Sequence, residues 1–485
     1  MRDVGQVATE AISLSPVVFH ERRWIPWVMF FADVLALEIA LLMAWHTRLL
    51  LVRWIPVQLS LDQLRGLALA VAILPIIQAF QGAYPGYGAG PVSRLRDWSY
   101  AIAFFFGALA VWDYLVLGGQ WSRGVLVIAA GYAFIILPLA EAAIRELLTR
   151  WGVWGSPVVI LGAARTGALV TKLLKQNRTL GMIPVAMFDD DPNKIGSMVE
   201  GVPVVGRVAT AQKWADEVRI AILAMPGVHR VHTAALVRDL HFPQIILVPD
   251  LFGFESLWVQ AKDLGGVLGL EIRKNLLIPR SRRIKRALDY LLGVPLALIS
   301  VPLIAVLALW VKLVDPSGPV FFVQEREGYR GRPIRVWKLR TMFPDAEARL
   351  RRYLAENPEA RAEWERFFKL KNDPRVLPFV GRFLRETSLD ELPQLWNVLI
   401  GDMSLVGPRP FPSYHLDKFT REFRELRTSV LPGMTGLWQV SARSEGDLEV
   451  QEALDTYYIR NWSIWLDLYI LARTVIAVVV RRGAH

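Results

Sequence analysis

The chain of 485 residues contains no cysteine, which excludes disulfide bonds and thiolate metal sites. Its first twenty residues lack the charged start, apolar stretch and small-residue cleavage site of a cleavable signal peptide. Lysine is scarce beside arginine, and the formal net charge of +11 favours anionic partners such as nucleotide sugars, phospholipid headgroups or nucleic acid. A chain of this length exceeds a single core, so we expect two or three structural units.

Long apolar stretches fill the first third of the sequence, each about long enough to cross a ~30 Å hydrocarbon core as a helix. They cover residues 27–50, 64–81, 98–117 and 124–139. Arginines are more frequent on the side that holds both ends of this segment, which predicts that both ends face the cytoplasm. Asp33, Glu38 and Asp113 lie inside the stretches, where a carboxylate is either functional or faces the interior of the bundle.

After Ser156 the sequence changes to short apolar runs that alternate with helical patterns, which predicts a doubly wound parallel sheet. The expected strands cover residues 157–161, 184–188, 220–224 and 244–248. Gly162 and Gly167 follow the first of them, but Ala164 stands where a dinucleotide fingerprint requires its second glycine. The sequence therefore favours a Rossmann-like fold more strongly than a bound NAD.

A basic run at 273–286 precedes another apolar segment at 290–311, an arrangement typical of the cytoplasmic membrane surface. The segment is long enough to span the membrane, and spanning would carry everything after it to the opposite face. However, Pro295 and Pro302 interrupt its hydrogen-bond ladder, and Ser300 can satisfy the freed backbone groups. We favour a broken helix that enters the membrane and returns to the same face.

The remaining residues have the pattern of a compact soluble or surface-bound unit. Short strands are expected at 319–324 and 334–338, and a charged helical stretch at 345–371 is interrupted near Pro358. The apolar tail, 462–480, carries charges and tryptophans that suit an interfacial helix better than a span.

Asp390 and Glu391 form an adjacent carboxylate pair near the expected start of a helix. Ser388 followed three residues later by Glu391 fits a capping box, and two acids in a first turn suit the helix dipole. Pro393 would remove a helical hydrogen bond and favours an interrupted segment. The pair is therefore either a helix cap or a nucleophile and metal-binding site, and the surrounding sequence has to decide.

Glycine-, proline- and arginine-rich strings surround this pair. They are Lys338-Leu339-Arg340-Thr341-Met342, Gly401-Asp402-Met403-Ser404, Gly407-Pro408-Arg409-Pro410 and Pro432-Gly433-Met434-Thr435-Gly436-Leu437-Trp438-Gln439-Val440. Each string alone predicts a turn. Together they place fixed turns and cations beside carboxylates, which is what diphosphate chemistry requires.

These strings, with Arg385 before the pair and Gln394 after it, resemble the bacterial sugar transferases, the monotopic polyprenyl-phosphate phosphoglycosyltransferases. The resemblance runs from about Lys285 to Tyr458. The rest of the chain resembles the large members of this family, and residues 82–96 are similar to a stretch of those that transfer galactose phosphate.

The resemblance implies a membrane protein of three domains. These are a four-helix transmembrane bundle (1–150), a Rossmann-like α/β domain with a regulatory or structural role (151–272) and an α/β catalytic domain (273–485). Within the last, a re-entrant helix at 287–314 would break at Ser300 and Pro302.

The resemblance also implies a mechanism. Asp390 would attack the β-phosphorus of a UDP-sugar, release UMP and hold the sugar phosphate until undecaprenyl phosphate attacks it. Glu391 would assist as acid–base or metal partner, with Mg²⁺ bound at Asp390 and Glu391. The implied substrate-binding residues are Lys338, Arg340, Arg385, Gln394, Arg409, Gln439 and Arg443.

The expected partners are a UDP-sugar, undecaprenyl phosphate, the lipid bilayer and a second copy of the chain in a homodimer, with no nucleic acid. The expected location is the bacterial inner membrane, with the catalytic domain in the cytoplasm, and the expected pathway is O-antigen, capsule or exopolysaccharide synthesis. Galactose is the sugar that the resemblance favours, with glucose or another sugar as the alternative.

Two hypotheses from other functional classes stay open. A membrane-anchored NAD-dependent nucleotide-sugar epimerase or dehydratase would need a Tyr-x-x-x-Lys pair, and Tyr414 and Lys418 match that spacing, though far from the expected sheet. A non-catalytic scaffold for polysaccharide assembly would use the first 270 residues alone.

Overall fold

The computed structural model divides the chain into two compact units, 1–252 and 253–485. The residues that it describes are 22–225, 236, 238–248, 259–263, 268–272, 276, 278–367, 370, 373–412, 416, 419–441 and 448–479. The expected domain boundaries after residues 150 and 272 stay predictions.

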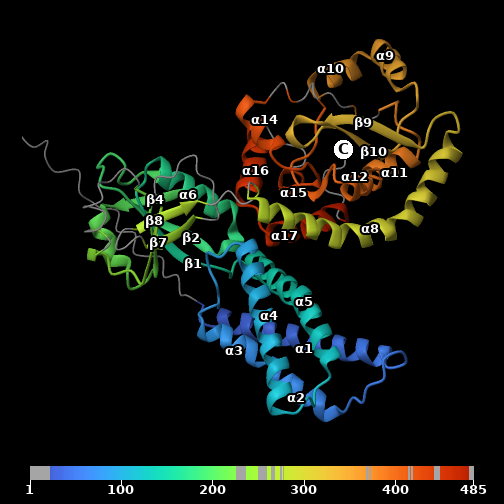
Figure 1. The fold of residues 1–485 in the computed structure, drawn as a ribbon. Coiled ribbons are helices and arrows are strands. Elements are labelled where there is room, and N and C mark those ends of the chain that lie inside the picture. Colours follow the sequence, from blue (N-terminus) through green and yellow to red (C-terminus); the bar gives the residue numbers. More distant parts are fainter. Residues whose placement is uncertain are drawn as a thin grey trace, which may run out of the picture. The chain divides into compact units, whose positions relative to one another are not determined.

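The first unit begins with long apolar helices, drawn in blue and teal in Figure 1. They are α1 (Ile25–Leu51), α2 (Leu61–Val71), α3 (Ile73–Phe80), α4 (Pro91–Val116) and α5 (Arg123–Arg150). Taken together, α2 and α3 make one apolar stretch that is interrupted at Ala72. Four N-terminal stretches and one later helix, α8, are therefore long and apolar enough to cross a membrane, which confirms the predicted four.

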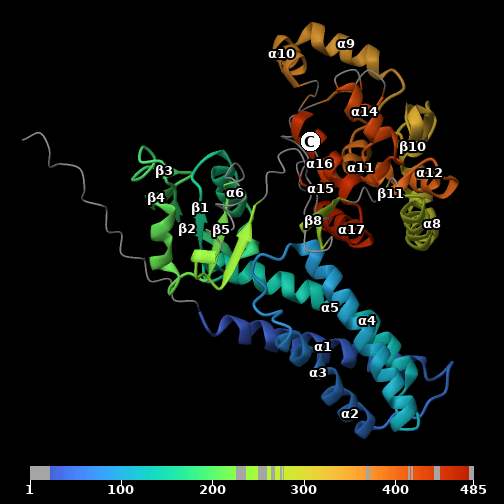
Figure 2. The same cartoon turned by 60° about the vertical axis from the view of Figure 1, so that its left-hand side comes forward.

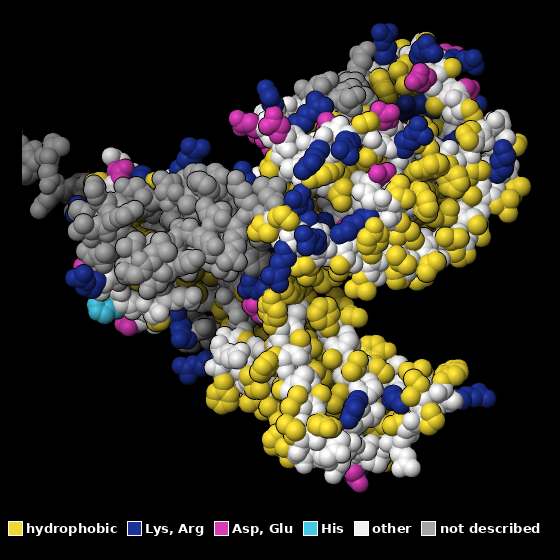
Figure 3. All heavy atoms as spheres, viewed as in Figure 1, with side chains coloured by type: hydrophobic (Ala, Val, Ile, Leu, Met, Phe, Trp, Pro, Cys, Tyr) yellow, Lys and Arg dark blue, Asp and Glu magenta, His cyan; other side chains and the backbone are white. Residues whose placement is uncertain are grey.

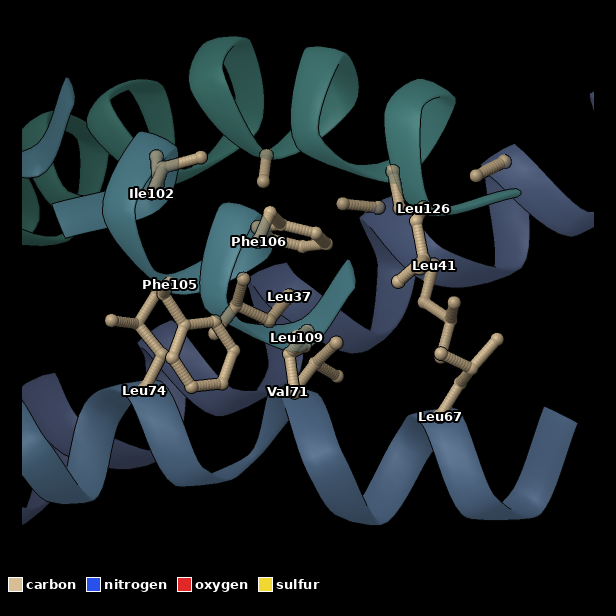
Figure 4. Packing of buried hydrophobic residues seen from close by; sticks show 14 of the residues in the cluster. Leu37, Leu41, Leu67, Val71, Leu74, Ile102, Phe105, Phe106, Leu109 and Leu126 are labelled. Carbon is tan, nitrogen blue, oxygen red and sulfur yellow. The ribbon is translucent and has the colours of Figure 1, made fainter. Parts of the chain in front are cut away.

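Apolar side chains from all of these helices converge in one core (Figure 4). Figure 4 labels Leu37, Leu41, Leu67, Val71, Leu74, Ile102, Phe105, Phe106, Leu109 and Leu126. The outward faces are apolar as well, since Leu69, Phe104 and Val127 are all more than 70 % exposed. A bundle that is hydrophobic on both its inner and outer faces suits a lipid environment.

The acids in this bundle have structural partners. Asp33 is fully buried and accepts a hydrogen bond from the hydroxyl of Tyr84 at 2.6 Å. Asp113 is also buried and accepts one from the backbone N–H of Trp121 at 2.9 Å. The interior-facing alternative therefore holds for Asp33 and Asp113, whereas Glu38 is half-exposed.

Helix α5 extends eleven residues beyond its predicted apolar stretch because its last turns pack against the start of the α/β region. Glu141 and Arg145 form a buried ion pair there. The guanidinium of Arg145 lies over the ring of Trp154, at 4.5 Å from the ring centre, and Trp154 donates to the carbonyl of Thr179 at 3.1 Å.

The α/β region of the first unit is a six-stranded sheet in the order β3-β4-β2-β1-β5-β6 (Figure 2). The strands are β1 (Ser156–Leu161), β2 (Met182–Phe188), β3 (Met198–Val199), β4 (Val202–Gly206), β5 (Ile220–Leu223) and β6 (Gln244–Leu247), and α6 (Arg165–Gln176) follows β1. All pairs are parallel except β3 with β4. The predicted parallel sheet and its four strands are confirmed.

The sequence pattern missed β3 and β4, which join in a tight turn through Glu200 and Gly201, both at positive φ. Pro203 lies inside β4, and a proline there removes a strand N–H and obscures the pattern.

The second unit holds the antiparallel pair β7 (Val259–Asp263) and β8 (Leu268–Ile272) and, separately from it, two small sheets. β9 (Phe321–Glu327) pairs antiparallel with β10 (Pro333–Leu339), and β11 (Ser404–Val406) pairs in parallel with β12 (Gly433–Thr435). The helices around them are α8 (Pro279–Val314), α9 (Ala346–Glu356), α10 (Pro358–Phe367), α11 (Val380–Thr387), α12 (Gln394–Ile400), α14 (Arg421–Thr428), α15 (Leu437–Ser441), α16 (Leu448–Asn461) and α17 (Ile464–Val479). The two predicted strands and the helix break at Pro358 are confirmed.

Helix α8 is 36 residues long and bends along its length (Figure 1). Pro295 and Pro302 lie inside it, and the hydroxyl of Ser300 donates to the carbonyl of Ala297 at 2.9 Å. Much of its surface is apolar and exposed: Leu298, Ile299 and Leu313 are each about 70 % exposed. Figure 3 shows hydrophobic side chains gathered over this helix.

Both ends of α8 pack against the same unit. Near its start, Asp289 accepts hydrogen bonds from the hydroxyl of Ser404 at 2.9 Å and from the N–H of Leu405 at 3.1 Å. Near its end, Leu307 and Val311 join a core with residues that follow the helix in sequence: Leu339, Leu377, Val380 and Leu384.

Candidate active site

Asp390 and Glu391 lie on a 3₁₀ turn, Leu389–Glu391, between α11 and α12. Ser388 adopts the left-handed conformation, with φ at 56°, and its backbone N–H bonds to the carbonyls of the last turn of α11. The side chain of Ser388 makes no capping hydrogen bond, so the capping-box reading was wrong. Instead, Ser388 ends the preceding helix and turns the chain so that the carboxylates face a cleft. A non-glycine residue at this φ is uncommon and costs about 1–3 kcal/mol, which is typical of functional sites.

Two cations converge on a single oxygen of Glu391. Lys338, from the end of β10, donates to Glu391 Oε1 at 2.6 Å, and Arg409 Nη2 donates to the same atom at 3.0 Å. Lys338 Nζ also lies 3.9 Å from Asp390 Oδ2, a distance that allows attraction without a hydrogen bond. Among the described residues, none donates a hydrogen bond to the carboxylate of Asp390. Glu391 is therefore fixed, while Asp390 is available.

The two carboxylates differ sharply in acidity because their surroundings differ. Burial raises the pKa of Asp390 to about 6, against the opposing charge of Lys338 and with a further upward contribution from Glu391. Burial also acts to raise the pKa of Glu391, but the charges of Arg409 and Lys338 and their hydrogen bonds outweigh it and lower that pKa to about 2. One carboxyl of the pair is thus permanently ionised, and the other titrates near neutrality.

A buried asparagine sets the distance between the carboxylate turn and Lys338. Asn397, on α12, donates to the carbonyl of Arg335 at 2.7 Å and accepts from the N–H of Trp337 at 3.2 Å. These bonds fasten α12 to β10 one residue before Lys338.

The far end of α12 is held by an arginine of α8. Arg286 donates to the carbonyl of Val398 at 2.7 Å and to that of Met403 at 3.1 Å. Gly401 ends the helix at a φ of 100°, which glycine adopts readily, and a Cβ there would lie 3.3 Å from the Arg286 guanidinium. The string Gly401-Asp402-Met403-Ser404 therefore anchors the site to α8.

Asp390 and Glu391 open into a cleft of about 2700 Å³. Part of its lining is charged and includes Lys338, Arg385 and Arg409. Another part is apolar and comes from two helices. From α8 the lining takes Leu291, Leu292, Pro295, Leu296, Ile299 and Leu303, and from α17 it takes Leu471, Thr474, Val475 and Val478. The cleft can therefore receive a polyanion and an apolar chain side by side.

Five of the predicted substrate-binding residues line this cleft, and four of them differ in how firmly their side chains are held. Arg385 is exposed, and its guanidinium has no partner among the described residues. Its charge acts to lower the pKa of Asp390, but burial outweighs it. Lys338 and Arg409 are held by Glu391. Gln439 is buried, and its Nε2 donates to the carbonyl of Met434 at 3.2 Å.

The other three predicted residues are placed differently. Arg340 also lines the cleft, but its buried guanidinium pairs with Asp315 and donates to the carbonyl of Pro319, a geometry that favours a structural role. Gln394 is buried at the first position of α12 and is absent from the lining of the cleft. Arg443 lies outside the described residues.

Four residues that support the site were not predicted from the sequence: the half-buried Arg286 and the buried Asp289, Asn397 and Arg427. Asp289 and Arg286 stood in the basic run and its end, where their spacing of three residues on one helix face was the available signal. Asn397 and Arg427 carried no signal, because only the fold brings their partners near: backbone groups of β10 for Asn397, and Asp455 and the carbonyl of Arg409 for Arg427.

The donor set suits Mg²⁺ in part. Asp390 and Glu391 supply two adjacent carboxylates at a cleft, and in the part of the chain that the structure describes no group of three or more His, Cys, Asp or Glu gathers into a site. Mg²⁺ in phosphoryl transfer is held by one or two carboxylates, substrate phosphates and water. The pair therefore fits an ion that a diphosphate would bring or complete.

Comparison with known proteins places the chain in a family. The model for "Bacterial sugar transferase" matches residues 280–481, and that for "CoA-binding domain" matches residues 80–237. The undecaprenyl-phosphate galactose phosphotransferase of Salmonella typhimurium is 33 % identical over 414 residues, covering 81 % of this chain and 85 % of that protein. The chain belongs to the bacterial sugar transferase family.

Other relatives have names that do not give galactose. The UDP-glucose:undecaprenyl-phosphate glucose-1-phosphate transferase of Escherichia coli is 31 % identical over 405 residues, covering 81 % of this chain and 82 % of that protein. The exopolysaccharide production protein ExoY of Rhizobium meliloti is 40 % identical over 202 residues, covering 41 % of this chain and 88 % of its own length. The similarity to ExoY thus concerns a part of the chain about the size of the sugar transferase match.

Replacing Asn397 by leucine is expected to leave the N–H of Trp337 and the carbonyl of Arg335 buried without a partner. Each unpaired group costs about 1–3 kcal/mol, so the unfolding temperature in detergent should fall by several degrees. Asn357→Leu removes one hydrogen bond at a half-buried helix end and is the matched control. An unfolding temperature for Asn397→Leu no lower than that of the control would contradict the role given to this residue.

Proposed function

We propose that this protein transfers a hexose 1-phosphate from a UDP-sugar to undecaprenyl phosphate and releases UMP, as the first membrane step of polysaccharide synthesis. The observation that carries the proposal is the cleft itself, which is lined by the half-buried carboxylate of Asp390, by cations and by an apolar wall. The names of the relatives support the same substrates.

In the first step, Asp390 attacks the β-phosphorus of the UDP-sugar. A bond forms between a carboxylate oxygen and that phosphorus, and the bond from the phosphorus to the oxygen that bridges the two phosphates breaks. UMP leaves with the bridging oxygen, and the hexose phosphate stays on Asp390 as an acyl phosphate. Arg385 is free to bind the diphosphate, since no described residue holds its guanidinium.

In the second step, an oxygen of undecaprenyl phosphate attacks the same phosphorus. The bond to Asp390 breaks, the carboxylate is regenerated, and the lipid carries a diphosphate-linked hexose. Two displacements at one phosphorus predict ping-pong kinetics. The polyprenyl chain would lie along the apolar wall that α8 and α17 supply to the cleft.

Glu391 has the role of an ionised anchor in this scheme. Its carboxylate orients Lys338 and Arg409 toward the space beside Asp390, where the phosphates bind. When bound at Asp390 and Glu391, Mg²⁺ would neutralise charge on the diphosphate. The low pKa of Glu391 favours the anchor or metal role over proton donation.

The packing of α8 supports the re-entrant topology. A straight helix of 36 residues is about 54 Å long, and crossing a membrane would separate its ends by the whole bilayer. Here both ends of the bent helix pack against one unit, and the exposed apolar surface lies between them. The proposed location is the inner membrane of a bacterium, with the cleft on the cytoplasmic side, where UDP-sugars occur.

Galactose is the proposed sugar, on the resemblance of the sequence and the name of the Salmonella relative. Glucose is the competing choice, which the Escherichia coli relative supports equally. A panel of UDP-sugars with UMP release as the readout decides between them. The homodimer is likewise a proposal, to be checked by the mass of the detergent-solubilised protein.

The epimerase or dehydratase alternative has no further support, because the chain belongs to the bacterial sugar transferase family. Its Tyr414 and Lys418 lie outside the described residues. Nicotinamide absorbance in the purified protein would revive it.

Asp390→Asn should abolish UMP release, because an amide oxygen is a poor nucleophile; we expect a loss of about a thousandfold or more. With a UDP-sugar labelled at the β-phosphorus and no lipid, the wild-type protein should become labelled and the variant should not. Glu425→Gln, at an exposed ion pair of α14, is the control and should keep both activities. Wild-type turnover by Asp390→Asn would end the covalent mechanism.

The rate should depend on pH through the nucleophile. Asp390 acts in its ionised form, and its pKa is raised to about 6, so kcat/KM for the UDP-sugar should be constant above that pH. Below pH 6 it should fall by about tenfold per unit, since the ionised fraction falls in that proportion. A profile that stays flat down to pH 4.5 would show that Asp390 keeps an ordinary acidity in the working enzyme.

The absence of cysteine makes the topology directly testable. Single cysteines at Arg280, before the exposed part of α8, and at Glu422, on α14 after it, should both react with a membrane-impermeant thiol reagent only when the cytoplasmic side is open. Labelling of the two positions from opposite sides would show that α8 spans the membrane.

A further inference from the structure

A short strap, residues 407–411, carries Arg409 to the carboxylate turn, and its backbone is held at every carbonyl from 408 to 411. The N–H of Gly433 bonds to Pro408, Arg326 Nη1 bonds to Pro410 at 2.6 Å, and the N–H of Glu327 bonds to Phe411 at 3.1 Å. The remaining carbonyl, that of Arg409 itself, accepts from Arg427 Nη2.

The side chain of Arg427 is only 6 % exposed. Burying a charged guanidinium costs desolvation free energy, which a single backbone contact does not explain. Three rings surround it, with their centres 4.9 Å (Phe411), 5.1 Å (Phe419) and 5.5 Å (Phe423) from its central carbon. Its counterion is Asp455 of α16, with Nε and Oδ2 3.2 Å apart and the carboxylate 4 % exposed.

A buried ion pair of this kind contributes little net stability compared with apolar side chains of the same volume. Its contribution is geometric, because three rings and a carboxylate around a planar guanidinium restrict where it can lie. From there Arg427 holds the backbone carbonyl of Arg409, while the side chain of Arg409 donates to Glu391. Lys338, the other cation on Glu391, has a similar support, because Asn397 fixes its strand.

We infer that Arg427 is a positioning residue for the transfer reaction, and that Asp455 holds it there: together they set the reach of Arg409 into the cleft and so its contact with the diphosphate of the UDP-sugar. The inference rests on the proposed function, since the affinity in question is that for the UDP-sugar. Neither residue is among those that line the cleft with Asp390, so both act through Arg409.

The test is a double-variant cycle on the full chain in detergent, with UMP release measured against the concentration of the accepted UDP-sugar. Arg427→Met should raise KM by about tenfold, and Asp455→Asn by a smaller factor. Arg427→Lys keeps one donor and should recover part of the loss. The control is Arg421→Met, an exposed arginine of the same helix, which should leave KM unchanged.

The decisive comparison uses Arg409→Met. If Arg427 acts through Arg409, adding Arg427→Met to Arg409→Met should change KM no further, because the contact is already lost. Factors that multiply in the double variant, or a fall in kcat and unfolding temperature at constant KM, would overturn the inference. Should Arg427→Met fail to fold, Arg427→Lys and Asp455→Asn carry the same comparison.

The outcomes separate the two proposals. A wild-type protein that releases no UMP from any UDP-sugar overturns the proposed function, and the inference with it. A wild-type protein that does so, with independent effects of Arg409 and Arg427, overturns the inference alone.

Discussion

The site depends on one carboxylate oxygen. Glu391 Oε1 accepts hydrogen bonds from Lys338 and Arg409, which come from segments 53 residues before it and 18 residues after it. This single contact joins β10, the carboxylate turn and the 407–411 strap. It also reduces the repulsion between two half-buried cations. Three further features position the parts of this arrangement. They are the left-handed conformation of Ser388, the hydrogen bonds of Asn397 and the hydrogen bond of Arg427 to the strap.

The contact also explains how two neighbouring acids come to differ. Glu391 takes both cations and is stabilised as an anion, while Asp390 has the charge of Lys338 only at 3.9 Å and is left with the cost of burial. A nucleophile needs to be unpaired and partly desolvated, and an anchor needs to be paired. In the proposed reaction, the order Asp-Glu on a tight turn would meet both requirements with one pair of side chains.

The sequence predicted the elements well where the pattern was local. The apolar stretches, four strands of the sheet, the break at Pro358 and the carboxylate pair all followed from composition and spacing, and Asp390, Glu391, Lys338, Arg385 and Arg409 do share one cleft. Prediction failed or stayed incomplete where the role of a residue depended on an element or side chain that the local pattern did not reveal. Ser388 had the local pattern of a cap, but α11 runs up to it and makes it a helix end. Arg340 lines the cleft, but its guanidinium pairs with Asp315, so its substrate-binding role stays a prediction.

The apolar wall of the cleft connects substrate binding to acidity. Leu291, Leu292 and Leu296 of α8 line the same space as Asp390, and burial is the largest cause of its raised pKa. In the proposed reaction, a wall that binds a polyprenyl chain would also limit the access of water to Asp390 and to the acyl phosphate formed on it. Because a desolvated carboxylate is less stable as an anion, it is a stronger nucleophile toward phosphorus once ionised. The bend in α8 that lays this wall beside the carboxylate turn would thus serve the chemistry as well as the membrane.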